Sequence, residues 1–319
     1  MSLTLTIACD SFELVRGLRD KTVYAKDIEL RFQPEMTNPT RHKAMVRDLA
    51  FDICEMNICT YLIAREAGVS LTALPVFLFR KFRHGNIFIR PDGPIKSPED
   101  LSTARIGCPN LQAAAVIWAS GILRDTFGID QRGPIWVTER EEDLPFTTPT
   151  NLKLERAPPG HNVADLLIHG DLDAIITPQI PELFLVGEPR IARLFPDYAD
   201  RERAYYVASG LFPIMHVTAI KSELVDKEPW IIESLLAAFE ASKRDAYERL
   251  RLDRTIPLAW FSARWEEERR LLGDDPWIYG LGEQNRRNLT TIIEYTNRQG
   301  LISAPPSVEK LFVLPDRSA

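Results

Sequence analysis

The sequence contains no apolar run that approaches the roughly 20 residues needed to cross a bilayer. It also lacks the short motifs of nucleotide binding, zinc proteolysis and serine nucleophiles, since GxGxxG after a strand, a Walker loop, HExxH and GxSxG are all missing. A basic excess is absent as well, because 39 basic and 45 acidic side chains give a net charge of −6. These absences argue against a membrane-spanning protein, a nucleotide-dependent enzyme and a nucleic-acid-binding protein.

Cysteine is scarce, and the four residues are Cys9, Cys54, Cys59 and Cys108. The spacing of Cys54 and Cys59 is not that of a zinc knuckle, and the strand-like surroundings of three of the four suit small buried hydrophobes. We therefore expect reduced structural thiols. The N-terminal residues alternate as in a strand and lack the basic start and apolar core of a secretory signal, so we expect a cytoplasmic protein.

A length of 319 residues suggests about two domains. Strand-like runs alternate with helix-like runs along the chain, which predicts an α/β fold with mixed, mostly parallel sheets. The expected strands are Leu3–Ala8, Phe51–Glu55, Leu74–Phe79, Asn86–Arg90, Ala104–Cys108, Asp173–Ile176 and His216–Lys221. The expected helices are Ile58–Ala67, Leu111–Phe127, Glu182–Val186, one that starts at Pro229, and Glu283–Gln299.

Breaks in composition near Pro91–Pro94 and Gly210–Pro213 predict two crossings between lobes. Residues 1–92 and 213–319 would form a discontinuous outer lobe, and residues 93–212 would form an inserted lobe. Two lobes joined by a hinge enclose a cleft, which is a natural place for a small molecule.

The turn at residues 80–84, Arg-Lys-Phe-Arg-His, concentrates potential cations in a chain that is otherwise acidic. Arginine can hold a carboxylate through two parallel hydrogen bonds, and His84 can exchange a proton near neutral pH. The turn therefore indicates an anion site, although a solvated basic turn would have the same composition.

Polar residues also follow three of the expected strands, at Asn57, at Asn110 and from Thr177 to Gln179. In open α/β sheets, ligands bind beyond the carboxyl ends of the strands, where the free N–H groups of helix starts favour anions. The three strand ends are candidates to line one cleft, although ordinary N-capping is the simpler explanation for any one of them.

Two further motifs have both a functional and a structural interpretation. In Gly210–His216 a histidine begins a strand after an apolar run, and such a histidine is more often a core residue unless it meets His84 across a cleft. In Gly273–Gly280 two adjacent acids could bind a metal, but a capped turn packed by Trp277 is the simpler interpretation. The remaining histidines, which show no pattern, are His42, His161 and His169.

Several segments of the chain together resemble the 4,5-dihydroxyphthalate decarboxylase family. They are residues 79–84, 210–216, 273–280 and 283–286, with Pro75 and Phe77. The similarity runs from Leu5 to about Phe312, and its most specific stretches are Arg-x-Phe-Arg-His and Phe-Pro-Ile-Met-His. The resemblance implies the two-lobed fold of type II periplasmic binding proteins, used here by a cytoplasmic enzyme. It also implies the removal of one carboxylate from a hydroxylated phthalate in bacterial phthalate breakdown.

The chemistry of this reaction suits the residues. In 4,5-dihydroxyphthalate each carboxylate is para to a hydroxyl, so deprotonation of that hydroxyl pushes electrons to the ring carbon that carries the carboxylate. Protonation of this carbon gives a dienone, which loses CO2 and regains aromaticity. The enzyme then needs a base, an acid, cations for the retained carboxylate and surface on which the ring can stack.

We assign His84 and His216 as the acid and the base, without deciding which does which. Phe82 and Trp118 would add ring-stacking surface. Substrate binding is expected of Arg80, Arg83, Asn57, Asn110, Gln112, Gln179 and Phe212. No cofactor is required, because the phenol itself carries the developing charge.

Two alternatives remain open. One is a non-catalytic cytoplasmic binding protein of the same fold for an aromatic or other small carboxylate, and the missing secretory signal counts against a transport receptor. The other is an enzyme with a divalent metal held by His84, His216 and an acid such as Glu55 or Asp275. The expected partners are a small aromatic carboxylate and a second copy of the chain, with neither nucleic acid nor membrane.

Overall fold

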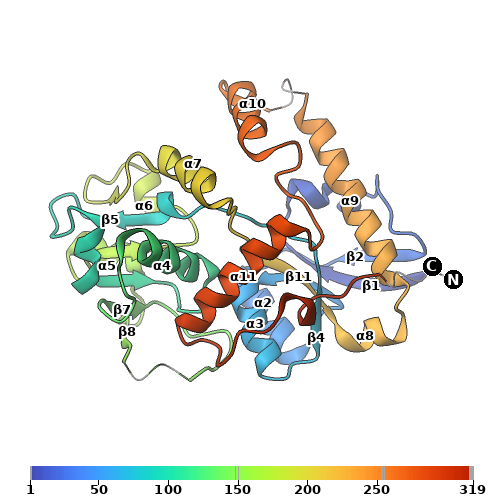
Figure 1. Cartoon of the computed structure of the whole chain (residues 1–319), viewed down its shortest axis with the longest axis horizontal. Helices are drawn as coiled ribbons and strands as arrows, with labels where there is room; N and C mark the ends of the chain where they lie inside the picture. Colours follow the sequence, from blue (N-terminus) through green and yellow to red (C-terminus); the bar gives the residue numbers. More distant parts are fainter. Residues whose placement is uncertain (1, 148, 150, 253, 255, 316–319) are drawn as a thin grey trace. The chain divides into compact units, whose positions relative to one another are not determined.

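The computed structural model describes residues 2–147, 149, 151–252, 254 and 256–315, which form two compact units (Figure 1). Unit 1 comprises Met1–Arg80, His216–Leu289 and Pro306–Ala319, and unit 2 comprises Lys81–Met215 and Thr290–Pro305. This division differs from the expected lobes, whose borders followed residues 92 and 212 and which placed Thr290–Pro305 in the outer lobe. The first crossing comes earlier because residues 87–89 pair within the sheet of unit 2.

Unit 1 is built on a sheet with the strand order β2-β1-β3-β11-β4. Its strands are β1 (Leu3–Ala8), β2 (Ile28–Phe32), β3 (Ile53–Asn57), β4 (Leu71–Leu74) and β11 (His216–Lys221). Its helices are α1 (Arg16–Arg19), α2 (Asn38–Asp48), α3 (Ile58–Glu66), α8 (Ser222–Lys227), α9 (Ile231–Leu250), α10 (Phe261–Leu272) and the first part of α11 (Glu283–Arg298). β1 is parallel to β2 and β3, whereas β11 is antiparallel to β3 and β4.

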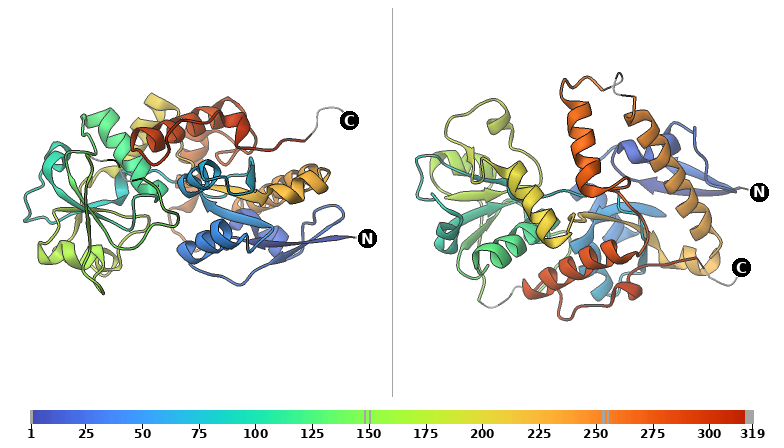
Figure 2. Two further views of the ribbon diagram at one scale, coloured as in Figure 1. Left: turned by 90° about the horizontal axis from the view of Figure 1, so that it is seen from below. Right: turned by 45° about the horizontal axis from the view of Figure 1, so that its top comes forward.

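The core of unit 1 follows from the alternation of apolar residues along its strands. Leu5 and Ile7 are two residues apart on β1 and therefore point to the same face of the sheet. Leu235 and Phe239, one helical turn apart on α9, pack in the same buried cluster, and Figure 2 shows α9 alongside these strands. This packing holds β1, β3 and β11 in fixed register.

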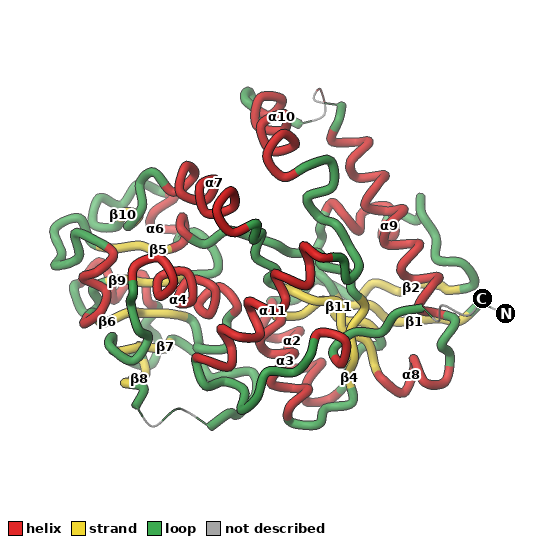
Figure 3. Tube along the Cα trace, in the orientation of Figure 1, coloured by secondary structure: helices red, strands yellow, loops and turns green. Residues whose placement is uncertain are grey.

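Unit 2 is built on a sheet with the strand order β10-β5-β9-β6-β7-β8. Its strands are β5 (Ile87–Ile89), β6 (Arg105–Cys108), β7 (Ile135–Thr138), β8 (Lys153–Arg156), β9 (Ala174–Ile176) and β10 (Ala192–Arg193). Its helices are α4 (Ala114–Phe127), α5 (Val163–His169), α6 (Glu182–Leu185), α7 (Tyr198–Ser209) and the second part of α11. β6 is parallel to β7 and β9, β7 is parallel to β8, and β5 is antiparallel to its neighbours β9 and β10. Figure 3 shows the strands of each unit in yellow.

Helices cover both faces of the sheet in unit 2. Ile106 and Trp136 pack with Val116 of α4, whereas Val137 packs with Leu167 of α5. Trp136 and Val137 are neighbours on β7, so their side chains point to opposite faces, as the two clusters require.

Most of the expected elements are present, and β1 and β11 have the predicted bounds. The expected strand Leu74–Phe79 is wrong, because β4 ends at Leu74. Pro75 follows it, and a proline has no N–H to donate to a strand neighbour. The Pro75 carbonyl instead accepts a hydrogen bond of 2.8 Å from Gly280 N. Among the described residues, no helix is long and apolar enough to cross a membrane.

Candidate active site

His216 is the first residue of β11, and its position is set by strand pairing. It lies directly opposite Asn57, the last residue of β3. Glu55 is two residues before Asn57, so its side chain shares the face of the sheet that carries Asn57 and His216. His216 and Glu55 are therefore diagonal neighbours across the pair of strands, within reach of long side chains.

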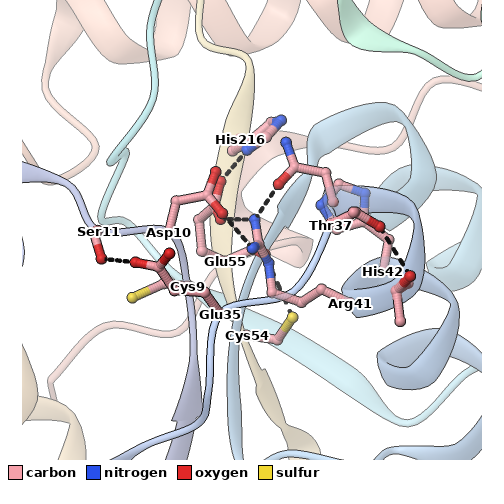
Figure 4. A network of polar contacts seen from close by, with 12 residues as sticks. Cys9, Asp10, Ser11, Glu35, Thr37, Arg41, His42, Cys54, Glu55 and His216 are labelled. Carbon is pink, nitrogen blue, oxygen red and sulfur yellow. Dashed lines mark hydrogen bonds and ion pairs between the residues drawn. The ribbon is translucent and has the colours of Figure 1, made fainter.

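The two side chains are joined by a hydrogen bond between His216 Nδ1 and Glu55 Oε1 (Figure 4). Glu55 is 1% exposed and His216 is 7% exposed. The His216 ring packs edge-on against Phe79 and His42, with centroid distances of 5.1 and 5.5 Å. These contacts fix the orientation of the imidazole, and Figure 4 shows its other nitrogen directed away from Glu55.

Arg41 of α2 completes the buried network on the far side of Glu55. Its guanidinium donates to Glu55 Oε2 through Nη2 and to the Glu55 backbone carbonyl through Nε, the latter at 3.0 Å. It also donates to Asp10 Oδ1 at 2.5 Å and to Asn38 Oδ1 at 2.7 Å. Arg41 is only 1% exposed, whereas the Asp10 side chain is 40% exposed. We call Asp10, Arg41, Glu55 and His216 the Glu55 network.

The electrostatics of this network keep Glu55 charged. Burial alone would raise its pKa, but attraction to His216, the hydrogen bond from His216 and the charge of Arg41 together lower the pKa to about 2. A carboxylate that is ionised at neutral pH accepts the proton on His216 Nδ1. The other ring nitrogen, Nε2, is then the atom that can accept a proton from a bound molecule or donate one to it.

His42, which shows no pattern in the sequence, lies in this part of unit 1. It is 3% exposed, lies beside His216, and its Nε2 accepts a hydrogen bond of 3.3 Å from Asn57 N. Asp10 and Arg41 were missed altogether. The signals that could have identified them are weak, because a charged residue after a strand and a charged residue within an amphipathic helix are both ordinary surface features.

Asn57 has the capping role that was the simpler expectation. Its Oδ1 accepts a hydrogen bond of 2.8 Å from Cys59 N at the start of α3. The nearby thiols are inert for a physical reason, since burial raises the pKa of Cys9 to about 12 and also raises that of Cys54 well above its ordinary value.

In unit 2, His84 and Arg83 of the basic turn are both buried. The His84 ring packs against Tyr205 and Phe195, at centroid distances of 5.4 and 5.9 Å. Burial, together with the charge of Arg201, lowers the pKa of His84 to about 4, so it is neutral at pH 7. Within the described part of the chain, His84 Nδ1 is buried and has no hydrogen-bond partner.

Arg83 is 2% exposed and donates to Pro178 O at 3.0 Å and to Met215 Sδ at 3.1 Å. Burial lowers its pKa to about 9, while Glu202 opposes this shift. Burial and the charge of Arg83 likewise lower the pKa of Lys81 to about 8. The basic turn is thus not a solvated surface loop, because its cations are held in a partly apolar environment.

Arg80 of the same turn lies in unit 1 and binds its own chain. Its Nη2 donates to Asn285 Oδ1 at 2.5 Å and to Ile278 O at 3.0 Å. Arg80 therefore anchors the segment Gly273–Gly280. The same segment is held by Asp275, which accepts from Lys243 Nζ at 2.5 Å and from the Tyr247 hydroxyl at 3.0 Å. The capped-turn interpretation of this motif stays a prediction, because these contacts anchor the segment without capping a helix.

Asn110 and Gln112 lie in the turn between β6 and α4, and both are fully buried. Gln112 uses its side chain within unit 2, because Oε1 accepts from Asp143 N and Leu144 N and Nε2 donates to Leu144 O. Asn110 Oδ1 accepts from Arg140 Nη2 at 3.4 Å. Asn110 Nδ2 is buried without a partner in the described part of the chain.

The remaining candidates differ in exposure. Gln179 is exposed, and its backbone carbonyl accepts from Thr177 Oγ1 at 2.7 Å. Phe212 is 5% exposed and stacks on Phe82 at a centroid distance of 5.0 Å. Trp118 is fully buried, with its ring N–H on Ile214 O at 2.9 Å, so no bound ring could stack on it as the structure stands.

The described residues contain no group of histidine and acid side chains arranged as a metal site. Among the described residues, no group of three or more His, Cys, Asp or Glu has an arrangement that could hold a metal ion. Glu55 is engaged by Arg41 and His216, and Asp275 is engaged by Lys243 and Tyr247.

Comparison with known proteins connects this site to a family. No family model matches the sequence. The 4,5-dihydroxyphthalate decarboxylase of Comamonas testosteroni is 31% identical over 319 residues, which span 97% of this chain and 96% of that protein. The protein of the same name from Pseudomonas putida is 33% identical over 213 residues, which span 65% of this chain and 82% of that protein.

Among solved structures, the alkanesulfonate-binding protein of Xanthomonas axonopodis pv. citri, bound to MOPS, matches 98% of both chains with a TM-score of 0.57. Its sequence identity of 14% makes this a likeness of fold alone. The expected fold class is confirmed, since the chain has the α/β fold of periplasmic binding proteins, with mixed sheets. With similarity to curated relatives over nearly its whole length, the chain belongs to the 4,5-dihydroxyphthalate decarboxylase family.

Proposed function

We propose that this protein is a carboxy-lyase that converts 4,5-dihydroxyphthalate to 3,4-dihydroxybenzoate and CO2, with His216 as an acid–base residue. The observation that carries the proposal is the hydrogen bond from His216 Nδ1 to a buried, ionised Glu55. This pairing orients an imidazole and fixes its tautomer, which a proton carrier in catalysis requires.

The reaction needs three proton transfers, with a net uptake of one proton for each CO2 released. One histidine accepts the proton of the hydroxyl para to the departing carboxylate, and the electrons move to the ring carbon that carries this carboxylate. That carbon takes up a proton and becomes tetrahedral. The bond to the carboxylate then breaks, CO2 leaves without the bonding electrons, and the ring regains aromaticity as a phenolate, which takes back a proton.

We assign these transfers to His216 and His84. His216 is supported by Glu55, and His84 is neutral at pH 7 because its pKa is about 4, so it is able to accept a proton. Arg83, Asn57, Asn110, Gln179 and Phe212 remain our candidates for substrate binding. Arg80 and Gln112 also remain candidates from the sequence, but their side chains already bind Asn285 and Leu144, so we expect them to act by holding loops.

The test is turnover of 4,5-dihydroxyphthalate, followed by CO2 release and by chromatography of 3,4-dihydroxybenzoate. We expect His216→Asn and Glu55→Gln to lower kcat by about 10²–10⁴-fold while the proteins stay folded. His161→Asn, which alters an exposed histidine, is the matched control and should have normal activity. A normal rate in His216→Asn would remove our assignment, and so would a normal rate in His84→Ala for His84.

Binding without turnover, with or without added divalent metal, would leave the binding-protein alternative. Treatment of the protein with a chelator distinguishes the metal-free decarboxylase from the metal-dependent alternative, because only the metal-free mechanism predicts an unchanged rate. We further propose a cytoplasmic homo-oligomer that binds no nucleic acid. The net charge of −6 supports the last point, and size-exclusion chromatography with light scattering tests the oligomeric state.

A further inference from the structure

Residues 140–144, which we call the strap, close over the turn between β6 and α4 in unit 2. The strap begins where Glu139 N and Arg140 N donate to the carbonyls of Cys108 and Pro109, both at 2.9 Å. It ends where Leu144 is held by the side chain of Gln112. The strap and the turn at residues 110–112 are thus bound to each other at several points.

Glu142 of the strap places its carboxylate on two backbone donors of the turn. Oε1 accepts from Leu111 N at 2.8 Å, and Oε2 accepts from Gln112 N at 3.0 Å. Each oxygen of one carboxylate thus binds one of two successive N–H groups. This is the geometry in which backbone N–H groups receive a carboxylate ligand.

The strap does not depend on Glu142 to stay in place. Gln112 binds the backbone of Asp143 and Leu144, and Arg140 Nη2 donates to Asn110 Oδ1 at 3.4 Å. These contacts would remain if the Glu142 side chain turned away from the two N–H groups. Burial raises the pKa of Glu142, which shows that its charge is held there at a cost in solvation.

A second observation at this turn points to a ligand. Asn110 is 0% exposed, and its Nδ2 is a buried donor without a partner in the described part of the chain. It directly precedes Leu111, and its Oδ1 accepts from Arg140, two residues before Glu142. A buried amide donor without a partner is costly, and this one belongs to the residue directly before the two carboxylate-binding N–H groups, which indicates a further acceptor at the turn.

We propose that the N–H groups of Leu111 and Gln112, together with Asn110 Nδ2, form a carboxylate subsite of unit 2, and that Glu142 occupies it as an internal stand-in for a carboxylate of the substrate. An aromatic dicarboxylate displaces the Glu142 side chain and takes over its hydrogen bonds. The identity of that dicarboxylate rests on the proposed function. The subsite itself rests only on the contacts within unit 2.

The competition has a measurable size. If Glu142 leaves the N–H pair free in about a tenth of the molecules, the apparent Kd of a competing carboxylate is about ten times its intrinsic value. Removal of the Glu142 carboxylate should therefore tighten binding by up to about tenfold. A purely structural role predicts no such gain.

The test uses phthalate, which has both carboxylates but no hydroxyl to deprotonate, so binding is measured without turnover. Calorimetry with the full-length protein should give a Kd for Glu142→Ala about tenfold lower than for the wild type. Glu141→Ala is the matched control, because it removes the same charge from an exposed neighbour and should leave the Kd unchanged. Asn110→Ala in the Glu142→Ala background should weaken phthalate binding again.

A second measurement does not depend on the substrate. We expect acetate to raise the Tm of Glu142→Ala in a saturable way, and chloride at equal ionic strength to have no such effect. A Kd for phthalate that is unchanged or higher in Glu142→Ala overturns the proposal, and so does the absence of phthalate binding in every variant. Tighter binding in a protein that fails to decarboxylate 4,5-dihydroxyphthalate would leave the subsite standing and refute the proposed function alone.

Discussion

Replacement of Glu55 by Gln removes one negative charge from the Glu55 network and keeps the shape of the side chain. Glu55 is buried between His216 and Arg41. The variant leaves Arg41, itself 1% exposed, with Asp10 as its remaining charged partner. We expect a folded but less stable protein, because a buried charge that loses a partner is strongly destabilising.

The magnitude can be worked from the pKa of Glu55, which is about 2 against an ordinary value of 4.5. A pKa that is lower in the folded state contributes stability above the unfolded value, and this stability is lost as the pH falls through the folded value. The difference corresponds to about 3 kcal/mol at pH 7, at about 1.4 kcal/mol per pKa unit. The wild type should therefore lose this advantage between about pH 4.5 and pH 2.

Urea unfolding followed by circular dichroism at several pH values measures the effect. Wild type and Glu55→Gln should differ by about 3 kcal/mol or more at pH 7, and the difference should shrink as the pH falls toward 2. Glu233→Gln, on the exposed side of α9, is the matched control and should show neither effect. An equal difference at pH 7 and pH 2.5 would show that Glu55 is not held as a carboxylate in the folded protein.

Three further predictions concern the contacts of individual side chains. Arg80→Ala and Asn285→Ala should each lower the free energy of unfolding by about 2 kcal/mol in urea. The double variant should lose less than the sum of the two single losses, since the two side chains share one hydrogen bond. Strict additivity would contradict this. Gln112→Ala should lower the free energy of unfolding by about 2–3 kcal/mol and speed amide hydrogen exchange at Leu144, because the Gln112 side chain makes three hydrogen bonds to the strap. Unchanged exchange would show that the strap is held without this side chain. A thiol reagent at pH 8 should leave all four cysteines unmodified in the native protein and react with four after denaturation, because all four are buried. Burial raises the pKa of Cys9 to about 12 and also raises the pKa values of Cys54 and Cys108. Rapid reaction of a native thiol would refute this.

The parts of the fold that the sequence predicts are those with a strong burial pattern. β1 alternates apolar and polar residues, and β11 is a strand-like run that is buried from His216 to Ile220, so both were found with their observed bounds. α7 and α10 have no buried residue, and β8 is exposed at all four positions. Without one buried face, neither helical nor strand periodicity appears in the sequence, so these elements could not be predicted from it.

The candidate site could also be predicted from the sequence only in part. His216 stands in a specific motif, but Glu55 was considered only as a metal ligand, and Arg41 and Asp10 were not considered. The Glu55–His216 pair joins residues 161 positions apart, and Arg41 reaches Asp10 over 31 positions. The contact between Glu55 and His216 depends on the register of β11 against β3, and a slip by one residue would turn Glu55 to the other face of the sheet. Register is a property of the packed sheet, so local sequence patterns do not reveal it.

The composition of the Glu55 network explains why an arginine accompanies the acid. With a neutral His216, the buried charges of Glu55 and Arg41 cancel, and the remaining charge of Asp10 lies at a side chain that is 40% exposed. When His216 accepts a proton, the positive charge it gains is balanced by Asp10 through the same chain of contacts. Neither state leaves an uncompensated charge in the protein interior, where such a charge is most costly. The charge of Arg41, together with the charge and the hydrogen bond of His216, lowers the pKa of Glu55 and so helps to keep it the carboxylate that accepts from His216 Nδ1. In the mechanism that we propose, the guanidinium therefore supports the acid–base role of His216, although it need not touch the substrate.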